Sequence, residues 1–406
     1  AVHTSTTTRC VIRGNRFISN LSYGILLSGA TVATVEDNEL EGHGMPAVAV
    51  ADQASGVITG NRLEGNEGYG IIARGDARAS IRGNWLLRNR SSAQGVHGGP
   101  GARMPARRMP EEGEVENRRA AIAVRDKATG DVVGNTLEEN GGYGILVTDM
   151  ANPVVEGNVL RHHARPAVAV LGESDCMVKG NCLQDNPGYG ILVASRAKPS
   201  VQENQLSRQG MPAIAVRNSA AVVRGNRLLD NRNYGILVSG TAQPTVEENV
   251  IQGQVMPAIA VMEQAGGLVR GNHLLDNSSY GIVLCGNARP LVVGNELRGQ
   301  GLVGIAARDE AGGLISQNLV EVSATTHGIV VCGSAQPDVR ENVLKGPGRP
   351  VVLWKGNAGG SIESEHKEAL KAQASSAVAG GLGAAEAEGR GKKRRREAEV
   401  EAVEGR

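Results

Sequence analysis

The chain has 406 residues and a formal net charge of +1, from 43 basic and 42 acidic side chains. This balance excludes a nucleic-acid binder that works through a strongly basic surface. Only 2% of the residues are aromatic while Gly numbers 56, which excludes an ordinary globular core rich in aromatic rings.

The cysteine pattern and the hydropathy indicate an intracellular protein. An odd number of cysteines at scattered spacings, without a CxxC pair, predicts neither a disulfide framework nor a zinc site. No apolar run reaches the roughly 18 residues of a transmembrane helix. We therefore expect the cytoplasm or the nucleus, with no cofactor, metal or membrane partner. The cysteines are Cys10, Cys176, Cys182, Cys285 and Cys332.

After an expected lead-in over residues 1–9, one pattern repeats along the chain. An asparagine recurs every 23 residues, apart from steps of 22 before Asn226, 24 before Asn342 and 51 after Asn84. Val or Ile lies three positions before each of them, and another apolar residue lies two positions after. The asparagines are Asn15, Asn38, Asn61, Asn84, Asn135, Asn158, Asn181, Asn204, Asn226, Asn249, Asn272, Asn295, Asn318 and Asn342.

This repeat predicts an all-β solenoid. Short β-branched triplets separated by Gly, Asn and Pro favour strands of about three residues, whereas leucine-rich repeats need a denser leucine register. We predict a right-handed parallel β-helix of 14 coils over residues 10–360, one coil per repeat. Each repeated asparagine is expected to turn inward at a corner and to bond to its counterpart on the next coil.

The coils also alternate, because all six tyrosines fall in a YGI triplet on every second coil. The intervening coils carry Pro46, Ala120, Pro166, Pro212, Pro257, Val303 and Pro350 at the same position. Tyrosines that stack on prolines are the structural interpretation, and a sugar-binding aromatic surface stripe is the functional one. The tyrosines are Tyr23, Tyr69, Tyr143, Tyr189, Tyr234 and Tyr280.

Two segments break the repeat. Residues 90–117 are predicted to be a disordered loop ejected from one coil, either a tolerated insertion or an element that binds a partner. Residues 361–406 are expected to form a short helix or cap, followed by a disordered charged tail. Its basic run is a candidate nuclear-import signal or a solvated charge run. The run consists of Lys392, Lys393, Arg394, Arg395 and Arg396.

The pattern offers little for catalysis. A GHG triplet surrounds His43, but the NTD, DD and RIK motifs that accompany GHG in polygalacturonases are absent, and hydrolysis of glycosides needs two carboxylates. We therefore expect His43 to be a surface histidine, Glu173 and Asp175 to be solvated, and the chain to be noncatalytic. A column of alternating charge is expected to form solvated ladders between coils. It runs through Glu156, Lys179, Gln202, Arg224, Glu247 and Arg270.

The double repeat carries a family resemblance. The pattern GN.L..N..YGI.V......P.V..N.......AIAV...G.G.V.GN has P.V..N coils, as at 242–244 and 288–290, that alternate with AGG coils at 265–267 and 311–313. It resembles the carbohydrate-binding and sugar-hydrolase type β-helix repeats of F-box only protein 10 and F-box only protein 11. Bacterial periplasmic copper-site assembly proteins use similar repeats.

The resemblance implies the substrate-recognition module of an SCF-type ubiquitin ligase. Its expected partner is Skp1, bound through a region upstream of Ala1, since no F-box helices precede the repeats. The predicted function is therefore a noncatalytic protein-interaction scaffold. The alternative is a polysaccharide-binding or polysaccharide-cleaving β-helix protein, with a glycan as the partner.

Overall fold

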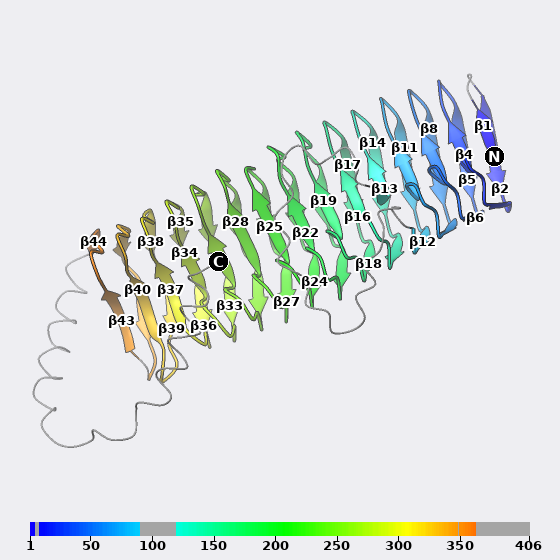
Figure 1. Cartoon of the computed structure of the whole chain (residues 1–406). Helices are drawn as coiled ribbons and strands as arrows, with labels where there is room; N and C mark the ends of the chain where they lie inside the picture. Colours follow the sequence, from blue (N-terminus) through cyan, green and yellow to red (C-terminus); the bar gives the residue numbers. More distant parts are fainter. Residues whose placement is uncertain (5–7, 90–118, 348, 363–406) are drawn as a thin grey trace, which may run out of the picture. The chain divides into compact units, whose positions relative to one another are not determined.

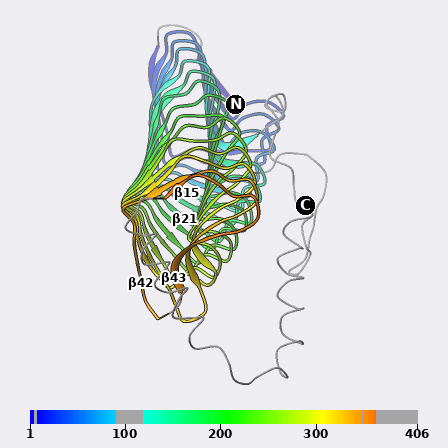
Figure 2. The same cartoon turned by 90° about the vertical axis from the view of Figure 1, so that its left-hand side faces the viewer.

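The computed structural model describes residues 1–4, 8–89, 119–347 and 349–362. They form 44 strands and, within these ranges, no helix. The strands build three parallel sheets, here called A, B and C, and every coil contributes one strand to each sheet in turn. Figure 1 shows the coils stacked side by side, and Figure 2 views the stack after a 90° turn. The structure confirms the predicted right-handed parallel β-helix.

Sheet A opens each coil. Its 15 strands, in spatial order, are β1 (Val2–Thr4), β4 (Ile25–Leu27), β7 (Val48–Val50), β10 (Ile71–Ala73), β13 (Ala120–Val124), β16 (Tyr143–Val147), β19 (Val168–Val170), β22 (Ile191–Val193), β25 (Ile214–Arg217), β28 (Ile236–Ser239), β31 (Ile259–Val261), β34 (Ile282–Leu284), β37 (Val303–Ala307), β40 (His327–Val331) and β43 (Arg349–Trp354).

Sheet B follows after a turn. Its 15 strands are β2 (Arg9–Arg13), β5 (Val32–Glu36), β8 (Ser55–Thr59), β11 (Arg78–Arg82), β14 (Thr129–Val133), β17 (Asn152–Glu156), β20 (Met177–Lys179), β23 (Ser200–Gln202), β26 (Val222–Arg224), β29 (Thr245–Glu247), β32 (Leu268–Arg270), β35 (Leu291–Val293), β38 (Leu314–Ser316), β41 (Asp338–Arg340) and β44 (Ser361–Ile362).

Sheet C completes each coil. Its 14 strands are β3 (Arg16–Ile18), β6 (Glu39–Glu41), β9 (Arg62–Glu64), β12 (Trp85–Leu87), β15 (Thr136–Glu138), β18 (Val159–Arg161), β21 (Cys182–Gln184), β24 (Gln205–Ser207), β27 (Arg227–Leu229), β30 (Val250–Gln252), β33 (His273–Leu275), β36 (Glu296–Arg298), β39 (Leu319–Glu321) and β42 (Val343–Lys345).

The interior consists of aliphatic side chains that rest on their counterparts one coil away. Ile236 and Val238 of β28 pair in register with Ile259 and Val261 of β31, and all four are 0% exposed. Each such side chain contributes roughly 1.5 to 3 kcal/mol when it is removed from water. Small and β-branched residues suit this narrow interior, which explains the low aromatic content of the sequence.

The repeated asparagines stand at the corner between sheets B and C. At Asn226 the Oδ1 accepts from the backbone N–H of Asn204 at 3.0 Å, and the Nδ2 donates to Asn249 Oδ1 and to Val201 O, both at 2.9 Å. The residue before each asparagine has a left-handed backbone, as at Gly225 (φ 62°) and Glu248 (φ 56°). Gly adopts this conformation without strain, which accounts for the frequent GN pairs.

The glycine of each YGI triplet is required by close approach of the next coil. A Cβ placed on Gly235 would lie 2.5 Å from the carbonyl oxygen of Ala258, and one on Gly190 would lie 2.4 Å from that of Ala213. Real Cβ atoms do not approach backbone oxygens this closely. The triplet therefore marks the coils on which sheet A begins with a tight inward turn.

The long step in the repeat leaves the sheets uninterrupted. β12 and β13 flank it in sequence, yet Ile71 of β10 pairs with Ile122 of β13 and Leu86 of β12 pairs with Leu137 of β15. The asparagine corner also continues, since the Asn84 N–H donates to Asn135 Oδ1 at 2.9 Å. The coils on either side of residues 90–118 are therefore direct neighbours in the stack.

The two ends of the stack differ in detail from what the sequence predicts. β1 already pairs with β4, so the coil structure includes part of the segment expected as a lead-in. Register is irregular between β40 and β43, where His327 pairs with Arg349 rather than with Pro350. By the contacts between its residues, the chain divides into two units, Ala1–Ser361 and Ile362–Arg406. The predicted loop over 90–117, the C-terminal helix and tail, and the basic run from Lys392 to Arg396 lie outside the described residues.

Candidate functional site

The outer face of sheet A is apolar, in contrast to an ordinary solvated sheet face. The middle residue of each strand points outward, yet Ala123, Leu146 and Leu192 are at most 2% exposed. Tyrosines from the turns before the strands cover this face. Tyr143 packs in one cluster with Ala123 and Leu146, and Tyr189 packs with Leu192 and Ala215.

A cleft of about 380 Å³ opens on this face over β4, β7, β10 and β13. Aromatic and aliphatic side chains alternate in its lining with three arginines and one carboxylate. The lining residues are Tyr23, Gly44, Met45, Pro46, Gly68, Tyr69, Ile72, Arg74, Arg119, Arg125 and Asp126.

Two of these arginines stand on adjacent coils in equivalent positions. Ala73 pairs with Val124 in sheet A, so Arg74 and Arg125, which follow them, are direct neighbours. Like charges placed opposite each other on adjacent strands are destabilising by a few tenths of a kcal/mol to about 1 kcal/mol. An anion bound between them would relieve that repulsion.

Arg125 is held in place by the residues around it. Its side chain is hydrogen-bonded to Tyr69, and its Nε lies 3.7 Å from Asp149 Oδ2. Burial opposes the charge, but Tyr69, Asp149 and Asp126 together raise the pKa of Arg125 above its usual value. The guanidinium is therefore a permanent, partly buried cation at the edge of the cleft.

The remaining polar groups of the cleft are tied to the backbone. Asp126 Oδ2 accepts from the Gly75 N–H at 2.7 Å, and Arg119 Nη1 donates to the Glu67 carbonyl oxygen. Among the described lining residues, the carboxylate therefore comes from Asp126, and its Oδ2 is already occupied by the hydrogen bond from the preceding coil. The arrangement offers cations and aromatic faces, which suits an anionic ligand with apolar ring faces.

The six tyrosines do not form a uniformly accessible stripe. Tyr143 is 0% exposed and Tyr189 is 7% exposed, so they serve the packing of sheet A. Tyr23 and Tyr69 are partly buried and line the cleft. Tyr234 and Tyr280 are partly buried against a second apolar cluster farther along the same sheet.

His43 is buried, which corrects its interpretation as a surface histidine. It is 0% exposed and belongs to a second polar ladder, at the corner between sheets C and A. Its Nδ1 accepts from the Asn20 N–H at 3.2 Å, and its own N–H donates to Asn66 Oδ1 at 2.9 Å. The ladder consists of Asn20, His43, Asn66, Asn89, Asn140, His163, Asn186, Gln209, Asn231, Gln254, Asn277 and Gln300.

Burial controls the titration of both histidines in this ladder. It lowers the pKa of His43, and it lowers the pKa of His163 to about 4. His163 Nε2 lies 3.2 Å from the Leu137 carbonyl oxygen, so this nitrogen carries the proton, and its Nδ1 has no hydrogen-bond partner among the described residues. Both rings are neutral at pH 7 and serve the corner, not the cleft.

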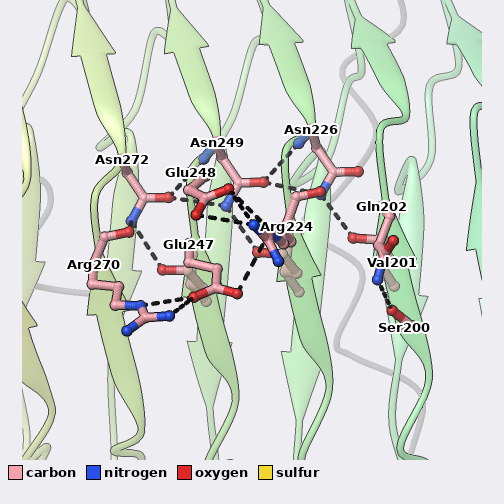
Figure 3. A network of polar contacts seen from close by, with 12 residues as sticks. Ser200, Val201, Gln202, Arg224, Asn226, Glu247, Glu248, Asn249, Arg270 and Asn272 are labelled. Atoms are coloured by element: carbon pink, nitrogen blue, oxygen red, sulfur yellow. Dashed lines mark hydrogen bonds and ion pairs between the residues drawn. The ribbon is translucent and has the colours of Figure 1, made fainter.

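Charged side chains on sheet B pair between coils (Figure 3). Glu247 lies between Arg270, at 2.7 Å, and Arg224, at 3.8 Å, and its side chain is only 7% exposed. Arg224 also contacts Glu248 at 2.8 Å. On another turn Glu173 and Asp175 are exposed, and Glu173 pairs with Arg196 at 3.1 Å. Glu173, Glu247 and Glu248 are thus paired with arginines, and neither they nor Asp175 line the cleft.

Tyr23 and Tyr69 of the cleft belong to the predicted aromatic stripe, whereas its arginines were missed in the sequence although a signal was present. Arg74 and Arg125 follow equivalent apolar triplets, in IIAR and IAVR, but 51 residues separate them. Aligning the coils across the long step would have placed two arginines together. The site depends on this adjacency and not on any short motif.

Other kinds of site find no support in the described part of the chain. No group of three or more His, Cys, Asp and Glu side chains there is placed to hold a metal ion. All five cysteines are free. None of the described segments is a helix of the length and apolarity needed to cross a bilayer.

Two family models match the sequence. The model described as "Right handed beta helix region" matches residues 1–104 and 212–365. The model described as "Periplasmic copper-binding protein (NosD)" matches residues 103–255. No curated relative matches. Nothing in these comparisons supports the specific resemblance to F-box only proteins 10 and 11, or Skp1 as a partner.

Solved structures with a similar fold include three carbohydrate-active enzymes. Periplasmic alginate epimerase AlgG is 14% identical (84% of this chain, 78% of that chain, TM-score 0.45). The A-module of mannuronan C-5 epimerase AlgE4 from Azotobacter vinelandii is 12% identical (83% and 90%, TM-score 0.40). The catalytic unit of a GH87 alpha-1,3-glucanase from Streptomyces thermodiastaticus is 12% identical (89% and 64%, TM-score 0.43).

These comparisons bear on two expectations. The expectation of a noncatalytic chain finds no support here, because a regular repeat does not exclude catalysis and the likeness to these enzymes shows the fold alone. Regular coils constrain the interior, whereas functional side chains project from turns and outer faces. The expectation of an intracellular protein is contradicted by the match to a periplasmic family, and free cysteines alone do not define a compartment. The chain belongs to the right-handed β-helix family.

Proposed function

We propose that this β-helix binds an acidic polysaccharide in the sheet A cleft and modifies it, in a compartment outside the cytoplasm. The match to a periplasmic family over residues 103–255 supports the location. The observation that carries the proposal is the pair Arg74 and Arg125, adjacent on neighbouring coils above a floor that includes Tyr69 and Ile72. Arginines recognise carboxylates, and aromatic rings pack against sugar faces.

The residue set favours chemistry beside a carboxylate over direct hydrolysis. Glycoside hydrolysis requires two carboxylic groups on either side of the bond, whereas Asp126 is the carboxylate of the described lining and already accepts from Gly75. Arg74 and Arg125 can neutralise a uronate carboxylate, which makes the adjacent carbon a stronger acid. The Tyr69 hydroxyl, hydrogen-bonded to Arg125, is the group placed to exchange that proton.

Calorimetric titration with an oligouronate and with a neutral oligosaccharide of equal length tests the binding. We expect the oligouronate to bind more tightly. Arg74→Gln and Arg125→Gln should each weaken it about tenfold, the value of one charge-assisted hydrogen bond. Arg78→Gln is the matched control, because Arg78 is an exposed arginine of sheet B on the same coil as Arg74. Equal binding of both oligosaccharides, or an equal loss in Arg78→Gln, would contradict the proposal.

Catalysis is tested separately by incubating the polymer and analysing the product by NMR. Tyr69→Phe removes the hydroxyl but keeps the ring, and Asp149 still holds Arg125, so we expect a smaller loss of affinity than in Arg125→Gln together with lost turnover. Turnover that survives in Tyr69→Phe would exclude this tyrosine as the proton-exchanging group.

A further inference from the structure

The coils that lie between tyrosine coils alternate once more. From β7 to β37, the residue that ends the sheet A strand or directly follows it is apolar on one such coil and arginine on the next, and the last such coil, that of β43, has Lys355 there. In chain order this position holds Ala51, Arg125, Leu171, Arg217, Met262 and Arg308. Arginine therefore returns on every fourth coil.

Stacking turns this sequence period into a distance along the molecule. Arg125, Arg217 and Arg308 follow or end β13, β25 and β37, and four strand steps separate each of these strands from the next (Figure 1). At about 4.8 Å per step, the arginines recur roughly every 19 Å, and the outer two are about 38 Å apart.

Each arginine lies one coil beyond a tyrosine. Strand order places β10 beside β13, β22 beside β25 and β34 beside β37, so the coils of Tyr69, Tyr189 and Tyr280 directly precede those of Arg125, Arg217 and Arg308. At the first of these places Arg125 is also hydrogen-bonded to Tyr69. We call these pairs the three tyrosine–arginine stations. The first of them forms part of the cleft, and the other two repeat its composition farther along sheet A.

The arginine side chains of the three stations are partly exposed. The Nε atoms of Arg125 and Arg308 are buried and have no hydrogen-bond partner among the described residues, so a ligand can meet only the other N–H groups of these side chains. Arg308 is also hydrogen-bonded to Cys285, a weak acceptor. A guanidinium has five N–H donors, so carboxylates of a ligand remain suitable partners.

Carboxylates of the protein close to the stations are directed to the backbone. Asp126 and Asp309, which follow Arg125 and Arg308, accept from the N–H groups of Gly75 and Gly286 at 2.7 and 2.9 Å. The middle station has Asn218 at the same position, which carries no charge. The stations therefore present cations beside aromatic rings, separated by apolar coils.

We infer that a linear acidic polysaccharide lies along sheet A and contacts all three tyrosine–arginine stations. This inference rests on the proposed function and extends it from a single cleft to a polymer track at least 38 Å long, as the strand spacing gives. A chain held at the first station meets the second at high effective concentration, so its affinity exceeds that of a fragment limited to the cleft.

Titration with oligouronates of two lengths tests the track. The short one fits the cleft alone, and the long one exceeds the roughly 38 Å between the outer stations. We expect Arg217→Gln and Arg308→Gln each to weaken the long chain about tenfold and to leave the short one unchanged. Arg125→Gln should weaken both. Arg227→Gln is the control, since Arg227 is exposed on sheet C of the same coil as Arg217.

The outcomes separate the two proposals. Unchanged binding of the long chain in Arg217→Gln and Arg308→Gln, with weaker binding in Arg125→Gln, overturns the track and leaves the cleft intact. No binding of either length overturns both. Arg217→Lys guards against a folding defect, because it retains the cation and the aliphatic stem. Recovery of long-chain affinity in Arg217→Lys supports the track, whereas a loss equal to that of Arg217→Gln together with a lower melting temperature overturns it.

Discussion

The corner asparagines show how one side chain can fix a whole coil. Asn226 shows the full set of contacts: its Oδ1 accepts from the Asn204 N–H of the coil before, and its Nδ2 donates to Asn249 Oδ1 of the coil after and to the carbonyl oxygens of Val201 and Arg224. Thirteen of the fourteen are buried, and Asn15 is exposed. Buried amides with complete partners both hold and align successive coils.

Removing one such amide should destabilise the stack markedly. Asn226→Leu keeps the size but removes the acceptor of the Asn204 N–H and the donor to the Val201 carbonyl oxygen, whereas Asn249 Oδ1 keeps its bond from the Asn226 N–H. At about 1 to 3 kcal/mol for each unsatisfied group, we expect a loss near 3 kcal/mol in the free energy of unfolding. Urea denaturation measures it, with Arg227→Leu as an exposed control on the same coil. A melting curve like that of the unchanged protein would refute this role.

At this scale the sequence predicts what repeats without exception. The asparagine corner could be recognised because one residue type recurs at every coil. The second ladder was not recognised, since His163, Asn66 and Gln209 look like a variable turn although each presents a side-chain nitrogen to a leucine carbonyl oxygen of the preceding coil. Chemical equivalence of different side chains becomes visible only when their positions are known.

Between elements, the corner that joins sheets C and A links stability to pH. His163 replaces the asparagine found on the coils before and after it, Asn140 and Asn186. Its folded pKa of about 4 lies below the ordinary value of 6.5, so the unfolded chain binds more protons between these two values. Stability from this group is complete above pH 6.5 and falls as the pH decreases towards 4.

His163→Asn should therefore reduce the acid sensitivity of the fold. The pKa difference of 2.5 corresponds to about 3 kcal/mol lost between pH 6.5 and 4 in the unchanged protein. Asparagine does not titrate and fits the ladder. We expect the stability of His163→Asn relative to that of the unchanged protein to rise by about this amount as the pH falls from 6.5 to 4, as measured by urea denaturation at each pH. His273→Asn, at an exposed position on sheet C, is the control. Parallel curves for His163→Asn and the unchanged protein would contradict the assignment.

Strands and their order could be read from the sequence, whereas the cleft could not. Apolar triplets at a fixed period determine which residues pair, so the three sheets follow from the spacing alone. The cleft depends on Arg74 and Arg125 meeting across a 51-residue step, and on tyrosines covering the outer face of sheet A. That outer face is apolar, although the outward side of a strand is usually polar. The alternation of apolar and polar residues therefore could not indicate where on this face a ligand-binding cleft lies.

Across the whole stack, no coil depends on distant parts of the chain. Three parallel pairings and two ladder contacts cross from the coil of β10 to the coil of β13. Co-expressed segments 1–89 and 119–406 should therefore assemble into one particle and co-elute in size-exclusion chromatography. Asn135→Leu removes a ladder contact at this boundary and should weaken the assembly. Segments that elute separately would show that the covalent connection is required.

The uninterrupted sheets beside residues 90–118 make this boundary a natural splice point. Because the two neighbouring coils are joined by strand pairing and by both polar ladders, a foreign sequence can replace the native connection without disturbing the coils on either side. A reporter domain inserted between Asn89 and Arg119 would be attached beside the first tyrosine–arginine station, and its signal would report when a polysaccharide binds there.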